Sequence, residues 1–280
     1  MGAYLRPASL DEAIAAAGQG GWMLLAGGTD FYPARVGKPV RENILDITGI
    51  EELRGISDRG DAWHIGAGAT WSDLRKADLP ACFDGLKAAA AEVGGVQIQN
   101  AATICGNICN ASPAADGVPP LLALSARVEL VDRGGIEDMP LSKFILGNRR
   151  TARRPDQIVT GIRIPRRPAA SKSAFYKLGA RRYLVISIVM AACTLDSDEN
   201  GAITRARVVV GACSEVATRI AGLEEALIGR QIGSGLADLV DHSHVAGLKP
   251  IDDVRATAGY RTEAAAEALR RLFDKLEGRE

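Results

Sequence analysis

The sequence predicts a mixed fold of helices and strands, of the α+β class. Short apolar runs with the length of strands, such as Trp22–Ala26, occur along a chain that also holds stretches of strong helix formers, such as Thr262–Phe273. Apolar residues make up 47% of the chain and aromatic residues only 5%, so the core must be built mainly from Ala, Val, Ile and Leu. A chain of 280 residues is long enough for two domains, or for one domain divided into lobes.

The charge balance and the cysteines indicate which binding partners and which cellular compartment to expect. Thirty-four basic residues balance thirty-four acidic ones, so no global charge favours nucleic acid or an anionic membrane. The five cysteines are an odd number, and the N-terminus has no signal-peptide pattern, so we expect a cytoplasmic protein. The longest apolar candidate, Tyr183–Leu195, is too short to cross a bilayer, so we expect no membrane span.

In the first half of the chain, capping residues and glycines mark the expected elements. Ser9 is followed three residues later by Glu12, the spacing of a capping box, so a helix is expected to begin there and to end near Gly18. Thr70 can cap a second helix, and Pro119 suits the first turn of another. The other expected helix is Phe83–Val93, and the expected strands are Trp22–Ala26, Asn43–Ile47, Trp63–Ala69 and Arg127–Val131.

The second half predicts a separate lobe that begins near Ser173. Pro165 stops a strand over Gln157–Ile164, and the residues that follow have the composition of a boundary. We therefore divide the chain into residues 1–54, 55–172 and 173–280. The other expected helices are Leu141–Gly147, Thr218–Ile228, Leu236–Val245 and Thr262–Phe273, and a turn is expected at Gly134–Asp138. The expected strands are Ala174–Leu178, Tyr183–Leu195 and Ile203–Val210, the last two joined by a hairpin turn at Ser197–Gly201.

The most informative stretch is Gln99–Val118, which is small, neutral and rich in hydrogen-bonding groups. Between residues 96 and 126 there is no Lys or Arg, and Asp116 is the only charged residue. Small residues let the backbone approach a ligand closely, and hydroxyl and amide side chains add hydrogen-bonding groups. A second such stretch, Leu24–Phe31, ends an apolar run in paired glycines and a threonine. The two stretches together predict loops that hold the pyrophosphate of one dinucleotide.

Several other motifs are absent or weak. The sequence has no P-loop, no Gly-x-Ser-x-Gly and no His-Glu-x-x-His. Gly66–Gly68 resembles half of a Rossmann fingerprint, but Trp71 stands where the third glycine is needed. Cys105 and Cys109 lack the further thiolates of an iron-sulfur site, so we interpret them as small residues of the loop. The basic run 148–155 is either a docking or phosphate-binding patch or an ordinary solvated loop.

Three motifs together resemble those of a known family. They are Ala26–Asp30, Thr103–Asn107 and Ala111–Asp116, and they are similar to the FAD-binding medium subunit of the molybdenum hydroxylases, the family of xanthine and carbon monoxide dehydrogenases. The resemblance covers nearly the whole chain, including Phe175–Arg182 and Tyr260–Arg261. It implies a two-lobed FAD-binding domain of the vanillyl-alcohol-oxidase (PCMH) type, followed by a C-terminal α/β domain of the CO dehydrogenase flavoprotein type.

The resemblance also implies the residues that bind FAD. Asp116 would face the ribityl or flavin side, Val159 would contact the flavin ring, and Lys177 matches a lysine close to the flavin. Cys105 stands where the family usually has a glycine; if that position needs a positive φ, a cysteine costs on the order of 1 kcal/mol. The residues implied to hold the pyrophosphate are Leu25, Ala26, Gly27, Gly28, Thr29, Asp30 and Phe31 in the first loop and Thr103, Ile104, Cys105, Gly106 and Asn107 in the second.

By the same resemblance, this chain is the electron-transfer subunit of an oxidoreductase complex. A large partner subunit would carry the molybdopterin, a small one the 2Fe-2S clusters, and the complex would be a dimer of heterotrimers. Electrons would leave the flavin for NAD⁺, a quinone or O₂, and this chain would hold no metal and no catalytic acid or base. Two alternatives are a standalone flavin oxidoreductase of the same fold and a scaffold subunit with a degenerate flavin site.

Overall fold

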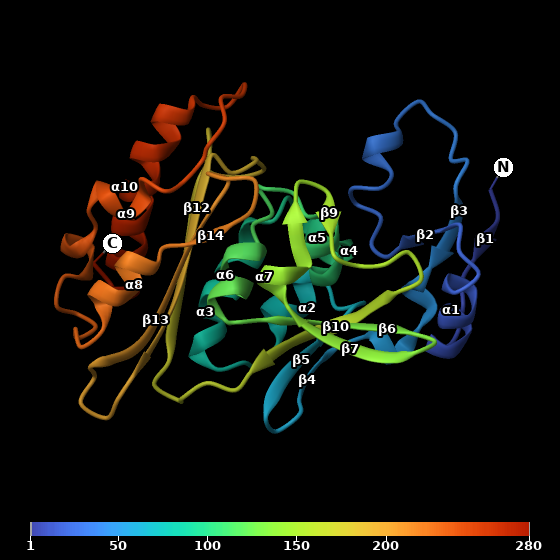
Figure 1. Cartoon of the computed structure of the whole chain (residues 1–280), viewed down its shortest axis with the longest axis horizontal. Helices are drawn as coiled ribbons and strands as arrows, with labels where there is room; N and C mark the ends of the chain where they lie inside the picture. The colour runs from blue at the N-terminus through green and yellow to red at the C-terminus, as the bar shows by residue number, and fades with distance from the viewer. Residues whose placement is uncertain (1, 280) are drawn as a thin grey trace. The chain divides into compact units, whose positions relative to one another are not determined.

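The computed structural model describes residues 2–279 and consists of two compact units (Figure 1). The first unit comprises residues 2–77, 96–111 and 126–165, and the second comprises residues 78–95, 112–125 and 166–279. The chain therefore passes between the units several times. The stretch Gln99–Val118 is divided by this arrangement: its first part, with Thr103–Asn107, belongs to the first unit, whereas Asp116 belongs to the second.

The first unit contains two main sheets of different type. In the small sheet, strand β3 pairs in parallel with β1 on one side and with β2 on the other. The larger sheet is antiparallel, in the order β4-β5-β10-β6-β7, and a two-stranded hairpin stands apart. The strands are β1 (Tyr4–Leu5), β2 (Trp22–Leu25), β3 (Asn43–Asp46), β4 (Ile56–Asp58), β5 (Ala62–Gly66), β6 (Arg127–Asp132), β7 (Gly135–Pro140), β8 (Ile145–Gly147), β9 (Arg150–Thr151) and β10 (Ile158–Pro165).

The helices of the first unit are short, and side chains cap several of them. The Ser9 hydroxyl accepts the amide of Glu12, as the sequence predicts, but the Glu12 carboxylate accepts the amide of Ala8 and not that of Ser9. Thr70 and Asp73 form a complete capping box. The helices are α1 (Leu10–Ala17), α2 (Trp71–Lys76), α4 (Val96–Ala101), α5 (Ile104–Asn110) and α7 (Leu141–Phe144), with 3₁₀ turns η1 (Pro33–Arg35), η2 (Ile47–Gly49) and η3 (Glu51–Leu53).

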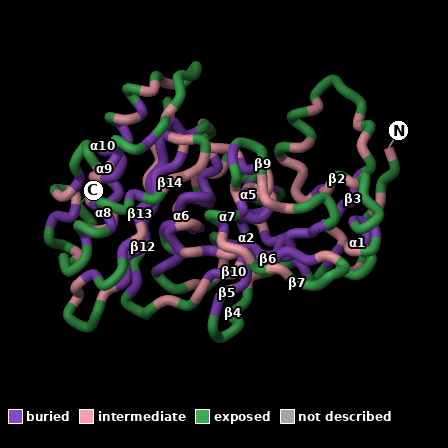
Figure 2. The backbone as a smooth tube through the Cα atoms, in the orientation of Figure 1, coloured by how far each residue is buried: buried purple, intermediate pink, exposed green. Residues whose placement is uncertain are grey.

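The second unit is one antiparallel sheet covered by helices on both faces (Figure 1). Successive residues of β12 point to opposite faces. Ala191 and Cys193 therefore pack toward α8 and α10, and Met190 and Ala192 pack toward α3. The backbone of β12 is buried along nearly its whole length (Figure 2). The elements are β11 (Lys172–Leu178), β12 (Val189–Ser197), β13 (Ile203–Gly211) and β14 (Thr218–Arg219), with α3 (Asp84–Glu92), α6 (Val118–Ala123), α8 (Ala221–Leu227), α9 (His242–Val245), α10 (Ala258–Glu277) and the turns η4 (Ala81–Phe83) and η5 (Leu236–Leu239).

The structure corrects several predicted elements. The strand predicted over Tyr183–Leu195 begins only at Val189, because the Arg181 guanidinium binds the carbonyls of Tyr183 and Leu184 and holds a loop there. The helix predicted over Leu236–Val245 is broken, since Val240 and Asp241 have extended backbones. The predicted turn Gly134–Asp138 is mostly strand β7, and the predicted loop around Thr103 is largely helical. The helix predicted over Leu141–Gly147 ends at Phe144, and the helix predicted from Thr218 begins at Ala221.

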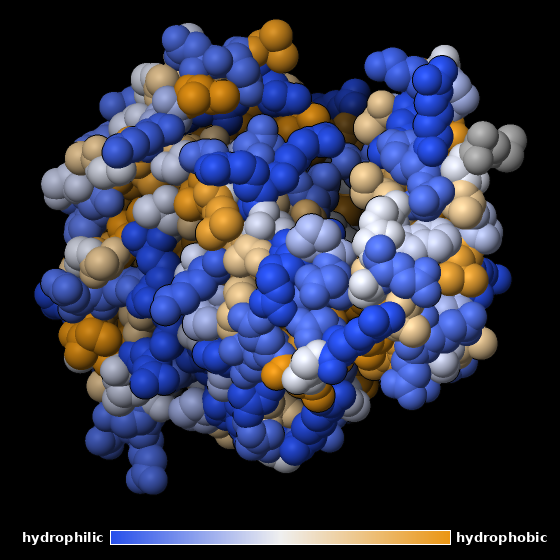
Figure 3. Space-filling view, turned by 45° about the vertical axis from the view of Figure 1, so that its right-hand side comes forward, coloured by the Kyte–Doolittle hydropathy of each residue, from blue (hydrophilic) through white to orange (hydrophobic). Residues whose placement is uncertain are grey.

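No helix within residues 2–279 combines the length and the apolar character that a bilayer span requires. On the face shown in Figure 3, hydrophobic residues form small groups separated by hydrophilic ones.

A buried arginine joins α10 to the sheet of the second unit. The Arg261 side chain is only 3% exposed. Its Nη1 donates to the carbonyls of Ile188 at 2.6 Å and Ala212 at 3.1 Å, and its Nη2 donates to Asp253 at 2.8 Å. Because the guanidinium serves three acceptors from separate segments, its loss leaves all three without this donor.

We expect Arg261→Met to lower the free energy of unfolding by about 3 kcal/mol, because the change leaves buried acceptors unsatisfied. Urea unfolding followed by circular dichroism measures this. The control is Arg271→Met on the same helix, whose pair with Glu267 is half exposed and should be worth less than about 1 kcal/mol. Equal losses in the two variants would contradict the role given to Arg261.

His64 is a buried base in the large sheet of the first unit. Its Nε2 lies 3.6 Å from Glu129 Oε1, and Glu129 also accepts the Thr160 hydroxyl at 2.8 Å and faces Arg59 at 3.7 Å. Burial lowers the pKa of His64, the Arg59 charge lowers that pKa further, and Glu129 acts in the opposite direction.

This shift predicts how stability depends on pH. The unfolded chain binds the His64 proton at a higher pH than the folded chain, so the contribution of His64 is complete above about pH 6.5 and is lost as the pH falls below that value. We expect His64→Gln to lose less stability than the parent protein between pH 7.5 and pH 5.5, as measured by urea midpoints. His242→Gln, which changes an exposed histidine, should keep the parent dependence.

Candidate functional site

A cleft in the first unit lies where the two predicted loops meet. Its volume is about 120 Å³. Ala26 and Gly27 line it from the segment after β2, and Ala101 and Thr103 line it from the segment between α4 and α5. Residues of both predicted segments therefore line one cleft, and their binding of a pyrophosphate stays a prediction. The other lining residues are Ile47, Thr48, Ile50, Arg54, Gly68 and Thr70.

Gly27 is where the two segments approach most closely. A Cβ atom placed on Gly27 would lie 1.9 Å from the Ala101 carbonyl oxygen and 3.0 Å from the Ala102 Cα. These neighbours are backbone atoms that cannot swing aside. Only glycine is compatible with this contact, so the residue type at position 27 fixes how the cleft is built.

The first loop presents backbone donors. Gly28 has a φ of +68°, which favours glycine, and the turn after it is closed by a hydrogen bond from the Tyr32 amide to the Gly28 carbonyl. Within residues 2–279, the amides of Gly28, Thr29 and Asp30 donate no hydrogen bond to another protein group. Successive amides in a turn with positive φ form an anion-binding concavity, which suits a pyrophosphate.

The rest of this loop is held by its neighbours. Leu25 is buried at the end of β2. The Arg35 guanidinium stacks 3.7 Å from the centre of the Phe31 ring and donates to the Phe31 carbonyl. Asp30 lies 3.6 Å from the Arg149 guanidinium, which places one residue of the basic run 148–155 beside the loop. Of that run, Arg153 and Arg154 are tied to nearby backbone carbonyls and carboxylates.

The second segment is the start of helix α5 and not an irregular loop. Thr103 is the N-cap of α5, and its hydroxyl accepts the Gly106 amide at 2.9 Å. A Cβ atom on Gly106 would lie 2.8 Å from that hydroxyl, so this position also favours glycine. The Asn107 side-chain oxygen is buried, and no other group within residues 2–279 is hydrogen-bonded to it.

Cys105 causes no backbone strain. It lies inside α5 with Ile104 and is 3% exposed, so the cost expected for a positive φ does not apply. Burial raises the pKa of Cys105, and it raises the pKa of Cys109, one helical turn away, to about 11. Both thiols are therefore protonated at neutral pH and are poor nucleophiles. Within residues 2–279 no group of three His, Cys, Asp or Glu side chains is placed to hold a metal ion.

The sequence analysis missed polar residues that come from outside both motifs. Arg54, Thr48 and Thr70 line the cleft. The Arg54 guanidinium donates to the Thr48 carbonyl at 2.8 Å, and it brings a positive charge into a site predicted to be neutral. A guanidinium in the cleft fits the negative charge of a pyrophosphate, and this guanidinium also lies 3.5 Å from the Glu51 carboxylate. No motif marks these residues, because a 3₁₀ turn and a helix cap bring them to the cleft.

Asp116 and Lys177 form a buried ion pair in the second unit. Lys177 Nζ lies 2.6 Å from Asp116 Oδ2, and the Ser187 hydroxyl donates to Asp116 Oδ1 at 2.5 Å. Lys177 also donates to the Glu92 carbonyl at 3.2 Å. Burial raises the pKa of Asp116, whereas the Lys177 ammonium and the Ser187 hydroxyl act in the opposite direction. The sequence singled out both charged residues but not Ser187 or Glu92.

Val159 lies in β10, opposite Leu130 of β6, and is 4% exposed. The register between β10 and β6 shifts just after it, between Val159 and Gly161. The flavin contact implied for Val159 stays a prediction.

Two family models match the chain. The FAD binding domain in molybdopterin dehydrogenase matches residues 1–167, and the CO dehydrogenase flavoprotein C-terminal domain matches residues 174–276. The glycine contact, the free amides and the arginine described above fit the pyrophosphate of FAD, so the residues present are suited to the cofactor of the first model.

Individual relatives agree along nearly the whole chain. The nicotinate dehydrogenase FAD-subunit of Eubacterium barkeri is 32% identical over 91% of this chain and 89% of its own length. The carbon monoxide dehydrogenase medium chain of Hydrogenophaga pseudoflava is 28% identical over 97% of this chain and 95% of its own length. The putative xanthine dehydrogenase FAD-binding subunit of Escherichia coli K12 is 30% identical over 92% of this chain and 90% of its own length.

Solved structures confirm the fold. A chain of the Cu,Mo-CO dehydrogenase in its cyanide-inactivated form matches with a TM-score of 0.88 and 26% identity, over 100% of this chain and 98% of that one. A chain of the H. pseudoflava carbon monoxide dehydrogenase matches with a TM-score of 0.87 and 28% identity, over 99% and 98%. Sequence motifs, cleft and comparisons lead to one assignment: the chain belongs to the family of FAD-binding medium subunits of the molybdenum hydroxylases, with FAD as its cofactor.

Proposed function

We propose that this chain takes electrons from the iron-sulfur clusters of a partner subunit and passes them to NAD⁺, a quinone or O₂. The observation that carries the proposal is the cleft in which Gly27 meets the Ala101 backbone, because it offers donors for a pyrophosphate and no group for acid-base chemistry. Among the residues that line it, none is Asp, Glu, His or Lys. Such a site binds and positions a cofactor and leaves the redox chemistry to it.

The residues of the first unit would hold the diphosphate. The amides of Gly28, Thr29 and Asp30 would donate to its oxygens, and Arg54 would offset its charge. Thr103, with the turn through Asn107 that it caps, would close the other side. When bound, FAD supplies a centre that accepts electrons singly and releases them in pairs.

The residues of the second unit would set the environment of the flavin end. We propose that Asp116 lies on its ribityl side and that Lys177 lies close to the ring. Asp116 holds the Lys177 ammonium in place and Ser187 holds Asp116, so the cation is fixed before any ligand arrives. A fixed cation favours negative charge near it and therefore favours reduction of a neighbouring flavin.

For the assembly, we propose a large molybdopterin subunit and a small 2Fe-2S subunit, arranged as a dimer of heterotrimers. The names of the relatives describe medium chains and subunits, which supports a partner-dependent role. We also propose three structural lobes, 1–54, 55–172 and 173–280, and the start of the second family match at residue 174 supports the last boundary. Five free cysteine thiols support a reducing compartment, the cytoplasm.

The absorption spectrum of the chain purified together with its partners tests this proposal. We expect flavin and iron-sulfur bands in one complex, and bleaching of the flavin band when the organic substrate is added. A flavin-containing chain that oxidises alcohols without any partner would instead identify a standalone oxidoreductase. A colourless chain that takes up no FAD would identify a scaffold, for which the unstrained backbone at Cys105 gives no support.

We expect Gly27→Val to weaken FAD binding by at least about tenfold, because any side chain at this position collides with the Ala101 carbonyl and displaces the loop. Flavin fluorescence titration measures the affinity, and circular dichroism checks the fold. The control is Gly247→Ala, where the added methyl group meets no atom within 4 Å. Unchanged FAD affinity in Gly27→Val would contradict the assignment of the cleft.

Thr103→Val offers a milder test of the same site, since it removes only the cap of α5 and costs about 1 kcal/mol of stability.

We expect Lys177→Met to lower the reduction potential of the bound flavin, because the variant removes the fixed cation. We expect Asp116→Asn to destabilise the fold by about 3 kcal/mol. Each variant leaves its partner buried without a counter-charge. In the double variant the losses of stability should be less than additive by about 1 kcal/mol or more, which urea unfolding of the four proteins measures. Additive losses would show that the two groups do not act as a pair. A potential that Lys177→Met leaves unchanged would separate Lys177 from the flavin.

A further inference from the structure

A group of polar and charged side chains lies on one face of the sheet of the second unit, at the end of β12 and the start of β13. The strand register places Thr194 opposite Arg207 and Asp196 opposite Arg205. Residues directly opposite each other in an antiparallel pair share a face, as do residues two apart on one strand. These four side chains therefore lie on one face, which packs against α3 further along the strands.

Asp196 is the carboxylate of this group, and its charge is balanced by Arg167. Asp196 Oδ2 lies 3.0 Å from Arg167 Nη1, and Asp196 Oδ1 accepts the Ser171 hydroxyl at 2.7 Å. Both side chains of the ion pair are 5% exposed. Arg167 also donates to the Ser125 hydroxyl at 3.2 Å. Both carboxylate oxygens of Asp196 are thus occupied by donors of the chain.

Arg207 is a cation without a counter-ion of its own. Within residues 2–279 its side chain makes no ion pair, and its Nη1 is buried without a hydrogen-bond partner. Burial and three neighbouring guanidinium groups lower the pKa of Arg207 to about 10, and Asp196 acts in the opposite direction. The three neighbours are Arg167, Arg205 and Arg219. Arg207 therefore stays charged at neutral pH, among charges of its own sign.

Two of the three neighbours have acids of their own. Arg167 is paired with Asp196, and Arg219 binds Glu224 with its Nε 2.9 Å from Oε1. Arg205 is exposed, and no ion pair holds it in the part of the chain that the structure describes. The group therefore carries an excess of two positive charges, on Arg205 and Arg207.

Three buried polar atoms of this group have no hydrogen-bond partner within residues 2–279. They are Arg207 Nη1, Arg167 Nε and Thr194 Oγ1, and Thr194 is only 1% exposed. Most buried polar atoms in proteins are hydrogen-bonded, so three exceptions in one place indicate a bound group from outside the chain. Two of the three atoms belong to guanidinium groups, which donate and cannot accept. The bound group must therefore accept hydrogen bonds, and an anion also offsets the excess charge, which water does not.

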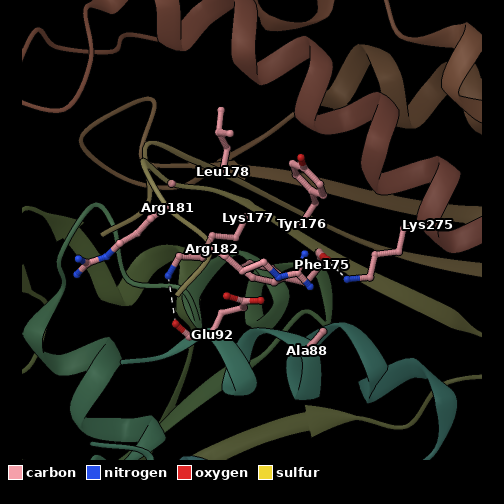
Figure 4. A pocket seen from close by; sticks show the side chains of 10 residues that line it. Ala88, Glu92, Phe175, Tyr176, Lys177, Leu178, Arg181, Arg182 and Lys275 are labelled. Carbon is pink, nitrogen blue, oxygen red and sulfur yellow. Dashed lines mark hydrogen bonds between the residues drawn. The ribbon is translucent and has the colours of Figure 1, made fainter. Parts of the chain in front are cut away.

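The cations beside β11 show the contrast within the same unit. They line a pocket of about 300 Å³ (Figure 4). Lys177 is paired with Asp116 and points to the Glu92 carbonyl. The Arg181 guanidinium holds carbonyls of its own loop, and Lys275 donates to a carbonyl of β11. Each of these three cations has an acceptor within the chain, whereas Arg207 has none.

We propose that Arg205 and Arg207 bind a phosphate group at this end of the sheet. Arg207 is partly exposed, so its guanidinium is reached from solvent, and its planar fork matches two phosphate oxygens. Arg205 lies on the same face, about 7 Å along the strand, and covers the phosphate from the solvent side. A phosphate group carries about −1.5 to −2 charges at neutral pH, which matches the excess of two, whereas a carboxylate balances only one.

The test is isothermal titration calorimetry of the FAD-saturated full chain with inorganic phosphate at low salt. Saturation with FAD keeps the probe from the cleft of the first unit. We expect one saturable site, with affinity lowered about tenfold in Arg207→Gln and in Arg205→Gln, since each loses a charge-assisted contact. The control is Lys249→Gln, an exposed cation of the same unit outside the group, which should bind as the parent does. No saturable binding, or equal affinity in the parent and in Arg207→Gln, overturns the proposal.

Urea unfolding distinguishes a binding site from a structural role of Arg207. A ligand that binds only the folded chain raises the urea midpoint. We expect phosphate to raise the midpoint of the parent and not that of Arg207→Gln, and we expect the two proteins to have similar midpoints in phosphate-free buffer. A variant that is clearly less stable without phosphate assigns Arg207 a structural role and overturns the proposal. Sodium chloride that raises the midpoint of the parent as much as phosphate does, at equal ionic strength, shows only screening of the arginines and also overturns it.

A titration with glycerol phosphate identifies the source of the phosphate group. Affinity equal to that of inorganic phosphate, or higher, assigns the site to phosphorylated small molecules. Binding of inorganic phosphate alone assigns it to the free ion. Both results uphold the phosphate site.

Discussion

The contact between the Gly27 backbone and the Ala101 carbonyl is the constraint on which the cofactor site depends. A methyl group does not fit between them, so the segment after β2 and the segment before α5 lie closer than any other residue type would permit. The cleft exists because these two backbones converge while the residues beside them stay small. Ala26 and Gly27 from the first segment and Ala101 and Thr103 from the second then line one cleft.

The second unit contains charged side chains that are buried. A carboxylate and an ammonium removed from water are costly unless each is fully satisfied. Both oxygens of Asp116 have donors, from Lys177 and Ser187, and Lys177 has a second acceptor in the Glu92 carbonyl. Arg261 also has three acceptors, although its buried Nε has no hydrogen-bond partner within residues 2–279. Such hydrogen-bonded groups fix the charges of the unit in position before a ligand binds, which is what an electrostatic environment for a cofactor requires.

The sequence was most predictive where one residue type carries a local physical requirement. Ser9, Thr70 and Pro119 could be placed because a helix cap and a first helical turn each favour particular residue types. Arg54 and Ser187 could not be placed, since only the folded chain brings them to their partners. The same limit explains the broken helix after Leu236 and the late start of β12 at Val189, because apolar periodicity alone does not register a loop held by a distant guanidinium.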